Sequence, residues 1–332
     1  MLPSTYHKLM VSEPDPNFKK AIQVVEVPLT EPGPGELLVK NRYAGMNASV
    51  GLFTAGLYPD TPPPPFEVQT EATGEVVMVG QGVTGFKPGD YVMTLGGGFG
   101  EYQTVNYRYA FPVPQATPDI TSFMVSALTA SISLEVVGEM KSNEVVLVTA
   151  AAGGTGQFAV QLAKLAGNHV IGTCSSEEKT QFLKELGCDR VINYKTEDLR
   201  QVLKTEYPKG VNLVYESVGG KTFDTCVSNL ARFGRLIIIG YVSEYGSGLE
   251  SVTGPRIYAR LLNKSASIRG FFLPFYAKYY ATHLARLLEL YSSGKLKVRV
   301  DTTEFKGLAE AGAAYDFLHS GKSAGKVLIT YE

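Results

Sequence analysis

The stretch Val148-Thr-Ala-Ala-Ala-Gly-Gly-Thr-Gly-Gln-Phe-Ala-Val-Gln161 decides the fold, because it passes from an apolar segment into a helical one through three glycines. Val145–Ala150 is a short apolar run, which predicts a buried strand, and Gly156–Ala166 has helical spacing. A glycine-rich turn is weak evidence by itself, since it serves as a phosphate cradle or as a plain strand-to-helix turn. The surrounding elements have to distinguish the two.

Further strands follow this stretch, with helices between them. The predicted strands of this half are Val145–Ala150, His169–Thr173, Arg190–Asn193, Leu213–Glu216, Arg235–Gly240 and Ser267–Phe272. Helices are predicted at Phe123–Val137, Gly156–Ala166, Glu177–Leu186, Phe223–Ala231 and Tyr280–Ser293. Strands that alternate with helical crossovers form a parallel sheet, so we predict a doubly wound, six-stranded Rossmann domain of the α/β class.

In this context the glycine loop is predicted to bind a dinucleotide. It follows the first strand of the sheet and begins the first crossover helix, as a pyrophosphate-binding loop does. Gly153 permits the tight turn, and Gly156 lets the helix approach the strand. Gly154 and Thr155 bring backbone N–H groups toward the phosphates, where the helix N-terminus adds partial positive charge.

The end of the second strand favours NADP over NAD. An NAD site normally carries Asp or Glu there, whereas the strand-end positions 173–176 contain no carboxylate. Ser175 can donate to an extra phosphate, Lys179 supplies a cation one helical turn later, and Tyr194 after the third strand adds a phenol. The alternative is that Ser175 only caps the helix while Lys179 is solvated.

The first half of the chain is β-rich, and its strands are predicted at Ala21–Val27, Leu37–Ala44, Gly74–Val79, Tyr91–Leu95 and Tyr102–Val105. The tail contains a helix at Leu308–His319 and a strand at Lys326–Tyr331 that have no place in the six-strand sheet. We therefore predict that the tail returns to the first domain. The domains are then 1–122, 123–297 and the returning segment 298–332.

Composition narrows the kind of protein. The 332 residues favour two domains, and 31 basic against 32 acidic residues leave no basic footprint for nucleic acid. No apolar run reaches membrane-spanning length, and three cysteines are a sparse, odd set typical of a reducing compartment. A cytoplasmic protein is expected. A peroxisomal location is possible, although the last residues show no peroxisomal signal.

Five motifs in order resemble the medium-chain dehydrogenase/reductase superfamily, in its quinone oxidoreductase and prostaglandin reductase branch. They are the segments Ala150–Gly156, Gly172–Lys179, Ile192–Thr196, Val214–Gly220 and Gly270–Leu273. The resemblance covers essentially the whole chain. It implies a GroES-like β-rich catalytic domain beside the Rossmann domain, NADP(H) as the coenzyme, and a homodimer formed through the last sheet strand.

The resemblance also bears on zinc, because zinc-dependent members of this superfamily hold the metal in the first domain. Thr70 stands where those relatives have a His ligand, and Asn47 stands where they have a Cys ligand. All three cysteines lie in the nucleotide-binding half, and the four histidines are scattered, so no tetrahedral ligand set can be drawn. No metal is expected.

A metal-free site with a hydride donor favours reduction of a polarised C=C bond. Reducing a simple ketone requires stabilising a full alkoxide, which a metal does well. Reducing an enone spreads the charge into an enolate that hydrogen bonds can stabilise. The expected partner is a small apolar enone, prostaglandin or quinone, with no nucleic acid involved.

The resemblance implies roles for three polar residues. Tyr245 is expected beside the nicotinamide ribose, where its hydroxyl would hold the substrate carbonyl. Tyr58 matches the proton-donating tyrosine of related enoyl-thioester reductases, and Asn47 is expected to position the nicotinamide side. Either phenol is protonated at neutral pH. The alternative for each tyrosine is an interface residue with a satisfied hydroxyl.

Position and resemblance together imply further coenzyme contacts at the carboxyl edge of the later strands. These are Ser217, Ile239 and the backbone of Phe271, Phe272 and Leu273. Ser323 stands where the family often has Asn, and it can donate a single hydrogen bond. The aromatic run after the last strand is expected to line an apolar substrate pocket, or simply to pack in the core.

Two other functions stay open at this point. Within the enzymes, the alternative is an NADPH quinone oxidoreductase. Outside them, some quinone-reductase-like proteins serve as lens crystallins or bind RNA while keeping NADPH. The sequence has no basic stripe for RNA.

Overall fold

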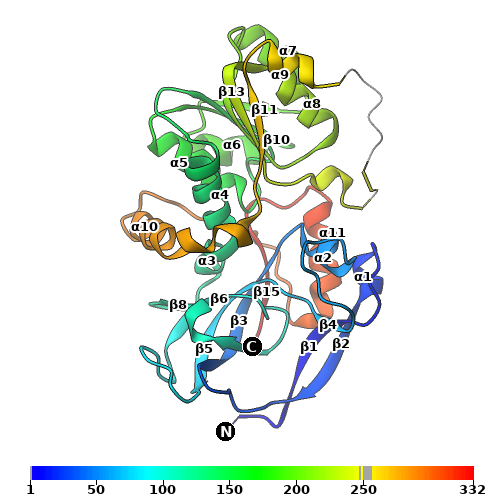
Figure 1. The fold of residues 1–332 in the computed structure, drawn as a ribbon, viewed down its shortest axis with the longest axis vertical. Coiled ribbons are helices and arrows are strands. Elements are labelled where there is room, and N and C mark those ends of the chain that lie inside the picture. Colours follow the sequence, from blue (N-terminus) through cyan, green and yellow to red (C-terminus); the bar gives the residue numbers. More distant parts are fainter. Residues whose placement is uncertain (1, 247, 250–255) are drawn as a thin grey trace. The chain divides into compact units, whose positions relative to one another are not determined.

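The computed structural model describes residues 2–246, 248, 249 and 256–332 (Figure 1). The chain separates into two compact units. The first unit contains Met1–Val125 and Val300–Glu332, and the second contains Ser126–Arg299. The tail is therefore part of the same unit as the N-terminal residues.

The second unit is built on a six-stranded parallel sheet in the order β11-β10-β9-β12-β13-β14. The strands are β9 (Val145–Val148), β10 (His169–Cys174), β11 (Arg190–Asn193), β12 (Val211–Glu216), β13 (Leu230–Ile238) and β14 (Ser267–Gly270). This sheet confirms the predicted fold class. The strand order reverses between β9 and β12, and ligands of such sheets bind at the carboxyl ends beside this reversal.

Helices connect these strands, including α5 (Gly156–Leu165), α6 (Glu177–Glu185), α7 (Leu199–Glu206), α8 (Gly220–Ser228), α9 (Tyr258–Leu262) and α10 (Tyr280–Ser292). Before the sheet, the predicted helix over 123–137 consists of α4 (Leu128–Ile132) between two π-helical turns, Phe123–Ala127 and Ser133–Val137. Short 3-10 turns follow β13 at Val242–Glu244 and β14 at Leu273–Tyr279.

Several boundaries differ from the sequence predictions; β9 ends at Val148 instead of Ala150, and β13 begins at Leu230 instead of Arg235. Helix α8 ends at Ser228 instead of Ala231, because Leu230 and Ala231 already belong to β13, where Leu230 is buried. β13 in turn ends at Ile238 and β14 at Gly270, two residues before the predicted ends. The helix α7 was not predicted, although Asp198 gives it a standard start by accepting a hydrogen bond from the Gln201 amide at 2.7 Å.

The first unit is an antiparallel β structure, as the GroES-like prediction requires. One sheet has the order β15-β3-β5-β6-β8, with β7 paired to β3, and a smaller sheet has the order β2-β1-β4. The strands are β1 (Thr5–Val11), β2 (Ile22–Pro28), β3 (Glu36–Met46), β4 (Phe66–Glu67), β5 (Glu71–Val79), β6 (Tyr91–Leu95), β7 (Tyr102–Asn106), β8 (Ala110–Val113) and β15 (Val327–Thr330). The short helices are α1 (Phe18–Ala21), α2 (Val50–Thr54) and α3 (Pro118–Thr121), with α11 (Ala311–His319) in the tail.

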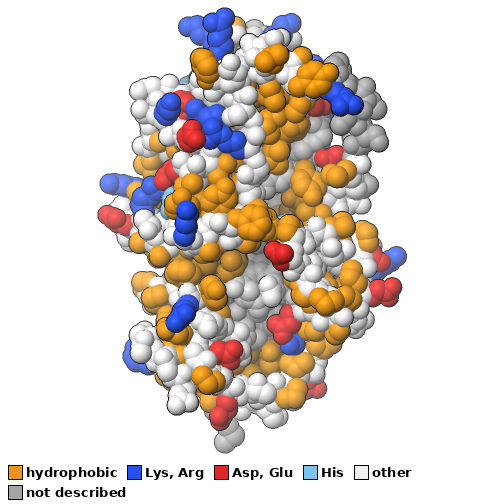
Figure 2. Space-filling view, viewed as in Figure 1, with side chains coloured by type: hydrophobic (Ala, Val, Ile, Leu, Met, Phe, Trp, Pro, Cys, Tyr) orange, Lys and Arg blue, Asp and Glu red, His pale blue; other side chains and the backbone are white. Residues whose placement is uncertain are grey.

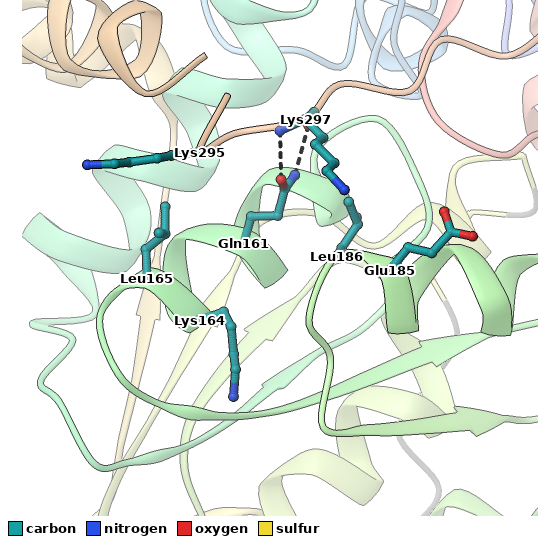
Figure 3. Close-up of a pocket in the computed structure, with 7 residues that line it drawn as sticks. All are labelled: Gln161, Lys164, Leu165, Glu185, Leu186, Lys295 and Lys297. Carbon is teal, nitrogen blue, oxygen red and sulfur yellow. Dashed lines mark hydrogen bonds between the residues drawn. The ribbon is translucent and has the colours of Figure 1, made fainter. Parts of the chain in front are cut away.

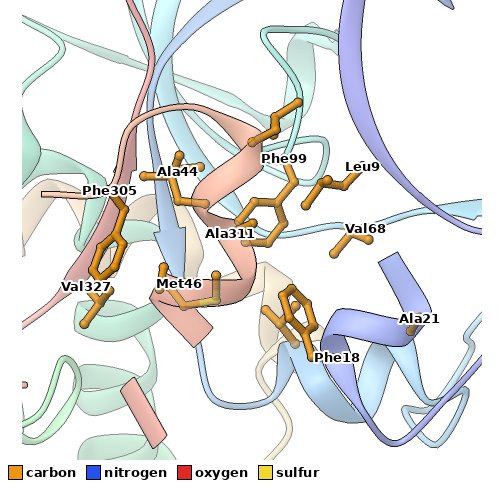
Figure 4. Close-up of a cluster of buried hydrophobic side chains, with 14 of the residues drawn as sticks. Leu9, Phe18, Ala21, Ala44, Met46, Val68, Phe99, Phe305, Ala311 and Val327 are labelled. Carbon is orange, nitrogen blue, oxygen red and sulfur yellow. The ribbon is translucent and has the colours of Figure 1, made fainter. Parts of the chain in front are cut away.

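The tail completes this unit. β15, red in Figure 1, pairs antiparallel with β3, in a register that joins Val327 to Met46 and Ile329 to Ala44. A core cluster around this pair takes side chains from β1, β3, α11 and β15 (Figure 4). Apolar burial is the main favourable term in folding, so the last residues stabilise the unit in which the first ones fold.

The surface carries both signs of charge. On the face in Figure 2, basic and acidic side chains are interspersed among hydrophobic ones. Within residues 2–246, 248, 249 and 256–332, the helices are all too short or too polar to cross a membrane.

Candidate active site

The glycine loop has the geometry of an anion cradle. A Cβ added to Gly156 would lie 2.5 Å from the Ala150 carbonyl oxygen, so only glycine lets α5 start this close to the strand. The Gly153 N–H bonds to the same carbonyl at 3.0 Å, which closes the turn. The amides of Gly154 and Thr155 have no acceptor in the described part of the chain. Two unpaired amides at the start of a ten-residue helix fit a phosphate group.

The side chain of Thr155 fixes this loop by hydrogen bonds within the second unit. Its hydroxyl lies 2.6 Å from the hydroxyl of Tyr215 and donates to the Ser126 carbonyl at 2.9 Å. Tyr215 is fully buried, and burial raises the pKa of its phenol. The Thr155 hydroxyl is therefore used internally, and the loop offers its backbone to a ligand.

The residues predicted to read the extra phosphate follow the carboxyl ends of two neighbouring strands, Ser175 and Lys179 after β10 and Tyr194 after β11. The Lys179 ammonium is 3.3 Å from the Ser175 hydroxyl, and the Tyr194 amide bonds to the Cys174 carbonyl at 3.0 Å. Ser176, not Ser175, caps α6 by accepting from the Lys179 amide. Lys179 is only 7 % exposed, so the alternative of a capping Ser175 and a solvated Lys179 is wrong.

The acidic residues at the start of α6 are already paired. Glu178 forms an ion pair with Arg299, whose guanidinium also lies 4.9 Å from the centre of the Phe182 ring. Glu177 accepts a hydrogen bond from Gln181 at 2.7 Å. These contacts reduce the repulsion that the two carboxylates would exert on a phosphate beside Ser175.

Three predicted coenzyme contacts form one row across the sheet. β12, β13 and β14 are in register at their carboxyl ends, and the residues that follow their last paired positions are Ser217, Ile239 and Phe271. The Ser217 hydroxyl oxygen is buried and has no hydrogen-bond partner among the described residues. A buried hydroxyl without a partner is costly, so this atom fits a site that a bound ligand completes.

The aromatic segment after this row is only partly buried. Phe271 stacks on Tyr276 with ring centres 5.0 Å apart, and Phe272 meets Phe275 edge to face at 5.0 Å. Leu273 is buried, and its carbonyl accepts from the Tyr280 hydroxyl at 3.0 Å. Phe275 is 72 % exposed. Simple core packing therefore does not account for the whole segment.

Tyr245 lies next to the same row. The Val242 amide bonds to the Ser217 carbonyl at 3.2 Å, which ties the turn before Tyr245 to the end of β12. The Tyr245 ring packs edge to face on Tyr241 at 4.7 Å, and its hydroxyl accepts from the Tyr241 amide at 3.4 Å. A Cβ at Gly240 would come within 2.7 Å of that hydroxyl, so glycine there makes room for the phenol.

One buried carboxylate at the end of β12, that of Glu216, was not among the site residues predicted from the sequence. Glu216 is buried at the end of β12, and desolvation raises the pKa of its carboxyl group. The amides of Val218 and Gly219 and the hydroxyl of Thr149 donate to it, the first at 2.9 Å. We assign Glu216 to holding the loop that follows the strand, since its oxygens are occupied by that loop.

In the first unit, Asn47 belongs to a hydrogen-bonded cluster at the end of β3. Its amide nitrogen donates to the Thr70 hydroxyl and to the Glu71 carboxylate, both at 3.2 Å. Its carbonyl oxygen accepts from the Lys326 ammonium at 2.6 Å, and Lys326 also forms an ion pair with Glu71. The Lys326 and Glu71 side chains are 2 % and 0 % exposed.

This donor set does not fit zinc. The positions that correspond to the zinc ligands of relatives carry the hydroxyl of Thr70 and the carboxamide of Asn47, and an ammonium group is bonded to the latter. Zinc prefers thiolate, imidazole and carboxylate ligands in a tetrahedral set. Within the described residues, no group of three or more His, Cys, Asp or Glu side chains could hold a metal ion.

Tyr58 and Ser323 also lie in the first unit. The Tyr58 ring is partly buried after α2 and meets Phe53 edge to face at 6.3 Å. Ser323 is buried in the segment before β15, where the next amide, that of Ala324, bonds to Asp301 at 2.7 Å.

Sequence reasoning missed Lys326 and Glu71. The available signal was a charged residue directly beside an apolar strand, with Glu71 at the first position of β5 and Lys326 just before β15. Charged residues at such positions are seldom buried unless they are paired, so their burial points to a built cluster.

A separate pocket of about 180 Å³ lies on the second unit (Figure 3). Its lining residues are Gln161, Lys164, Leu165, Glu185, Leu186, Lys295 and Lys297. The side-chain amide of Gln161 donates to the Lys297 carbonyl at 2.9 Å and accepts from the Lys297 amide at 2.8 Å, and Lys164 is paired with Asp189. None of the predicted site residues lines this pocket, which faces the second half of α5 instead of the glycine loop.

Comparison with known proteins agrees with this geometry. Residues 154–289 match the family model described as zinc-binding dehydrogenase, and residues 33–115 match the alcohol dehydrogenase GroES-like domain. Prostaglandin reductase-3 from Mus musculus is 47 % identical over 99 % of this chain and 90 % of its own length. A probable quinone oxidoreductase from Leishmania amazonensis is 46 % identical over 98 % of each chain.

A solved structure adds a three-dimensional match. The Escherichia coli quinone oxidoreductase complexed with NADPH superposes with a TM-score of 0.84 at 30 % identity, covering 98 % of this chain and 99 % of that one. The chain belongs to the medium-chain dehydrogenase/reductase superfamily. Within it, the similarity to prostaglandin reductase-3 and to quinone oxidoreductases confirms the branch that the five motifs indicated.

Proposed function

We propose that this protein is an NADPH-dependent reductase of the C=C bond of α,β-unsaturated ketones, with 15-oxo-prostaglandin-like substrates. The observation that carries the proposal is the 47 % identity to mouse prostaglandin reductase-3 across both units. The first unit, residues 1–122 with 298–332, then serves as the catalytic domain. Residues 123–297 serve as the NADP-binding domain.

The residues present fit NADPH. Gly153 to Gly156 would hold the pyrophosphate, Ser175, Lys179 and Tyr194 would hold the adenosine phosphate, and the row beginning at Ser217 would border the nicotinamide. The Lys179 ammonium lies within reach of the Ser175 hydroxyl, so both groups can approach one phosphate. A buried lysine that can form charge-assisted bonds is well suited to a phosphate. When bound, NADPH supplies the hydride that the substrate's β-carbon receives.

The chain itself then has to stabilise the enolate and deliver a proton. We assign the Tyr245 hydroxyl to the substrate carbonyl oxygen, because a phenol donates to the negative charge that develops there. Tyr58 is our candidate for the proton that reaches the α-carbon. The aromatic segment Phe271–Tyr280 would supply the apolar wall, since half-buried rings can cover a hydrophobic substrate.

The proposed activity is tested by following NADPH absorbance after adding 15-oxo-prostaglandin or an alkyl vinyl ketone. We expect enone-dependent NADPH loss, and the saturated ketone of the same carbon skeleton is the matched control. Protein that binds NADPH but turns over no member of a broad enone panel would refute the proposal. An ortho-quinone arm tests the second candidate, quinone reduction, which the Leishmania relative favours.

We further propose a homodimer formed through β14. This strand is the last in its sheet, so its outer backbone groups have no partner strand among the described residues of the unit. Pairing with the same strand of a second copy would remove that exposed edge. Size exclusion with light scattering is expected to give twice the mass of the chain, and a monomeric mass would rule out this arrangement.

The location proposed for this enzyme is the cytoplasm. The three cysteines are free and buried, and burial raises the pKa of the Cys188 thiol to about 12. Reduced, unpaired cysteines are typical of proteins in a reducing compartment.

A further inference from the structure

The cluster around Asn47 is built from three buried side chains and one that reaches the surface. Thr70, Glu71 and Lys326 are buried, with 5 %, 0 % and 2 % exposure, whereas Asn47 is partly exposed. Burying a charged pair is costly unless its remaining hydrogen bonds are satisfied. Glu71 meets this condition, because its second oxygen accepts from the Val125 amide at 2.6 Å. The cluster thus supports one exposed group, the Asn47 carboxamide.

The charges of the cluster fix which way this carboxamide points. An ammonium can only donate, so the atom 2.6 Å from Lys326 must be the Asn47 carbonyl oxygen. An ionised carboxylate can only accept, so the atom 3.2 Å from Glu71 must be the amide nitrogen. The two charges agree on a single orientation. The usual ambiguity between the two ends of an asparagine side chain is therefore absent here.

In this orientation Asn47 has no hydrogen left to donate. Its amide group carries two hydrogens, and both have acceptors, Thr70 and Glu71. The Thr70 hydroxyl acts as an acceptor toward Asn47 and cannot act as its donor, because its own hydrogen is donated to the Gly45 carbonyl at 2.5 Å. The Asn47 carbonyl oxygen accepts from Lys326 and keeps one lone pair. Toward a ligand, Asn47 is an acceptor only.

We propose that Lys326 and Glu71 are positioning residues that hold Asn47 as a hydrogen-bond acceptor for the coenzyme. The inference rests on the proposed function. Neither the enone group nor a quinone ring has an N–H or O–H to donate, so an acceptor-only group cannot hold the substrate carbonyl. NADPH has both kinds of donor, in its carboxamide and its ribose hydroxyls. Asn47 therefore contacts the coenzyme, and other residues bind the substrate carbonyl.

Asn47→Leu tests whether Asn47 contacts the coenzyme or the substrate. We expect the NADPH Kd, measured by fluorescence titration without substrate, to rise about tenfold, the size of one hydrogen bond. The KM for the enone at saturating NADPH should stay unchanged. Asn263→Leu, at the exposed asparagine that follows the last residue of α9, is the matched control and should alter neither constant. A raised enone KM with an unchanged Kd would overturn the inference.

The double variant Lys326→Met/Glu71→Gln tests the positioning itself. It removes both charges and leaves no uncompensated one, so its Tm should lie close to that of the wild type, well above that of Lys326→Met alone. The amide that replaces the Glu71 carboxylate would then donate to the Asn47 oxygen and turn the carboxamide around. We expect a Kd for NADPH about tenfold higher, although stability is kept. Lys20→Met, at an exposed lysine, is the control.

Combining Asn47→Leu with the double variant shows whether Lys326 and Glu71 act through Asn47. If Lys326 and Glu71 act through Asn47, the double variant should not weaken NADPH binding further in an Asn47→Leu background. A double variant that regains both wild-type Tm and wild-type Kd would overturn the inference, as would fully additive losses. If the double variant does not fold, the Kd against KM comparison of Asn47→Leu decides alone. Wild-type protein that fails to bind NADPH would refute the proposed function itself.

Discussion

Tyr245→Phe is expected to lower kcat for enone reduction about 100-fold, the loss typical when one donor to a developing oxyanion is removed. The phenol lies beside the carboxyl edge of β12 and β13, where its hydroxyl approaches Gly240 and the Tyr241 amide. Phenylalanine keeps the ring and its packing on Tyr241, so the fold should not change. Steady-state kinetics with an alkyl vinyl ketone, together with the NADPH Kd, measure the effect.

Tyr241→Phe is the matched control for this prediction, since it removes a neighbouring hydroxyl from the same turn. Its kcat should stay close to that of the wild type. Full activity of Tyr245→Phe would exclude the assigned role. A loss seen only with Tyr58→Phe would then move recognition of the carbonyl, as well as the proton, to the first unit.

Lys179→Met is expected to weaken NADPH binding about 10- to 100-fold and to leave NADH binding nearly unchanged. A hydrogen bond to a charged group contributes about 1.5–3 kcal/mol, and only NADPH carries the phosphate that this ammonium would bind. The Lys179 side chain is almost fully buried beside Ser175, so it is already ordered before the ligand arrives. Fluorescence titration with both coenzymes gives the ratio.

Lys184→Met, on the exposed side of the same helix, is the control for removing one positive charge. It should change neither affinity appreciably, because salt screens exposed charges that lie far from the ligand. Equal losses of NADPH and NADH affinity in Lys179→Met would mean that this lysine supports α6 without reading the phosphate.

The second unit was predictable because buried parallel strands are continuous apolar runs. β9 and the second half of β13 stand out as such runs between turn signals, and the glycine loop marks the first crossover. β1 was not predicted, since only Leu9 and Val11 of its seven residues are buried and its other positions are largely polar. A strand of this kind is defined by its pairing with β2 and β4.

The site residues likewise include some that the sequence could place and others that it could not. Ser217, Ile239 and Phe271 could be grouped from the sequence, because parallel topology brings the carboxyl ends of neighbouring strands to one edge. The contact of Asn47 with Lys326 spans 279 positions and depends on β15 pairing with β3. No periodicity within either segment reveals such a pairing.

The return of the tail to β3 has a consequence for the order in which a nascent chain matures on the ribosome. Residues 126–299 are translated before the tail and hold every strand of their own sheet, so this half can fold while synthesis continues. The N-terminal half has to wait for residues 300–332, because they contain both β15, which pairs with β3, and Lys326, which forms the ion pair with Glu71.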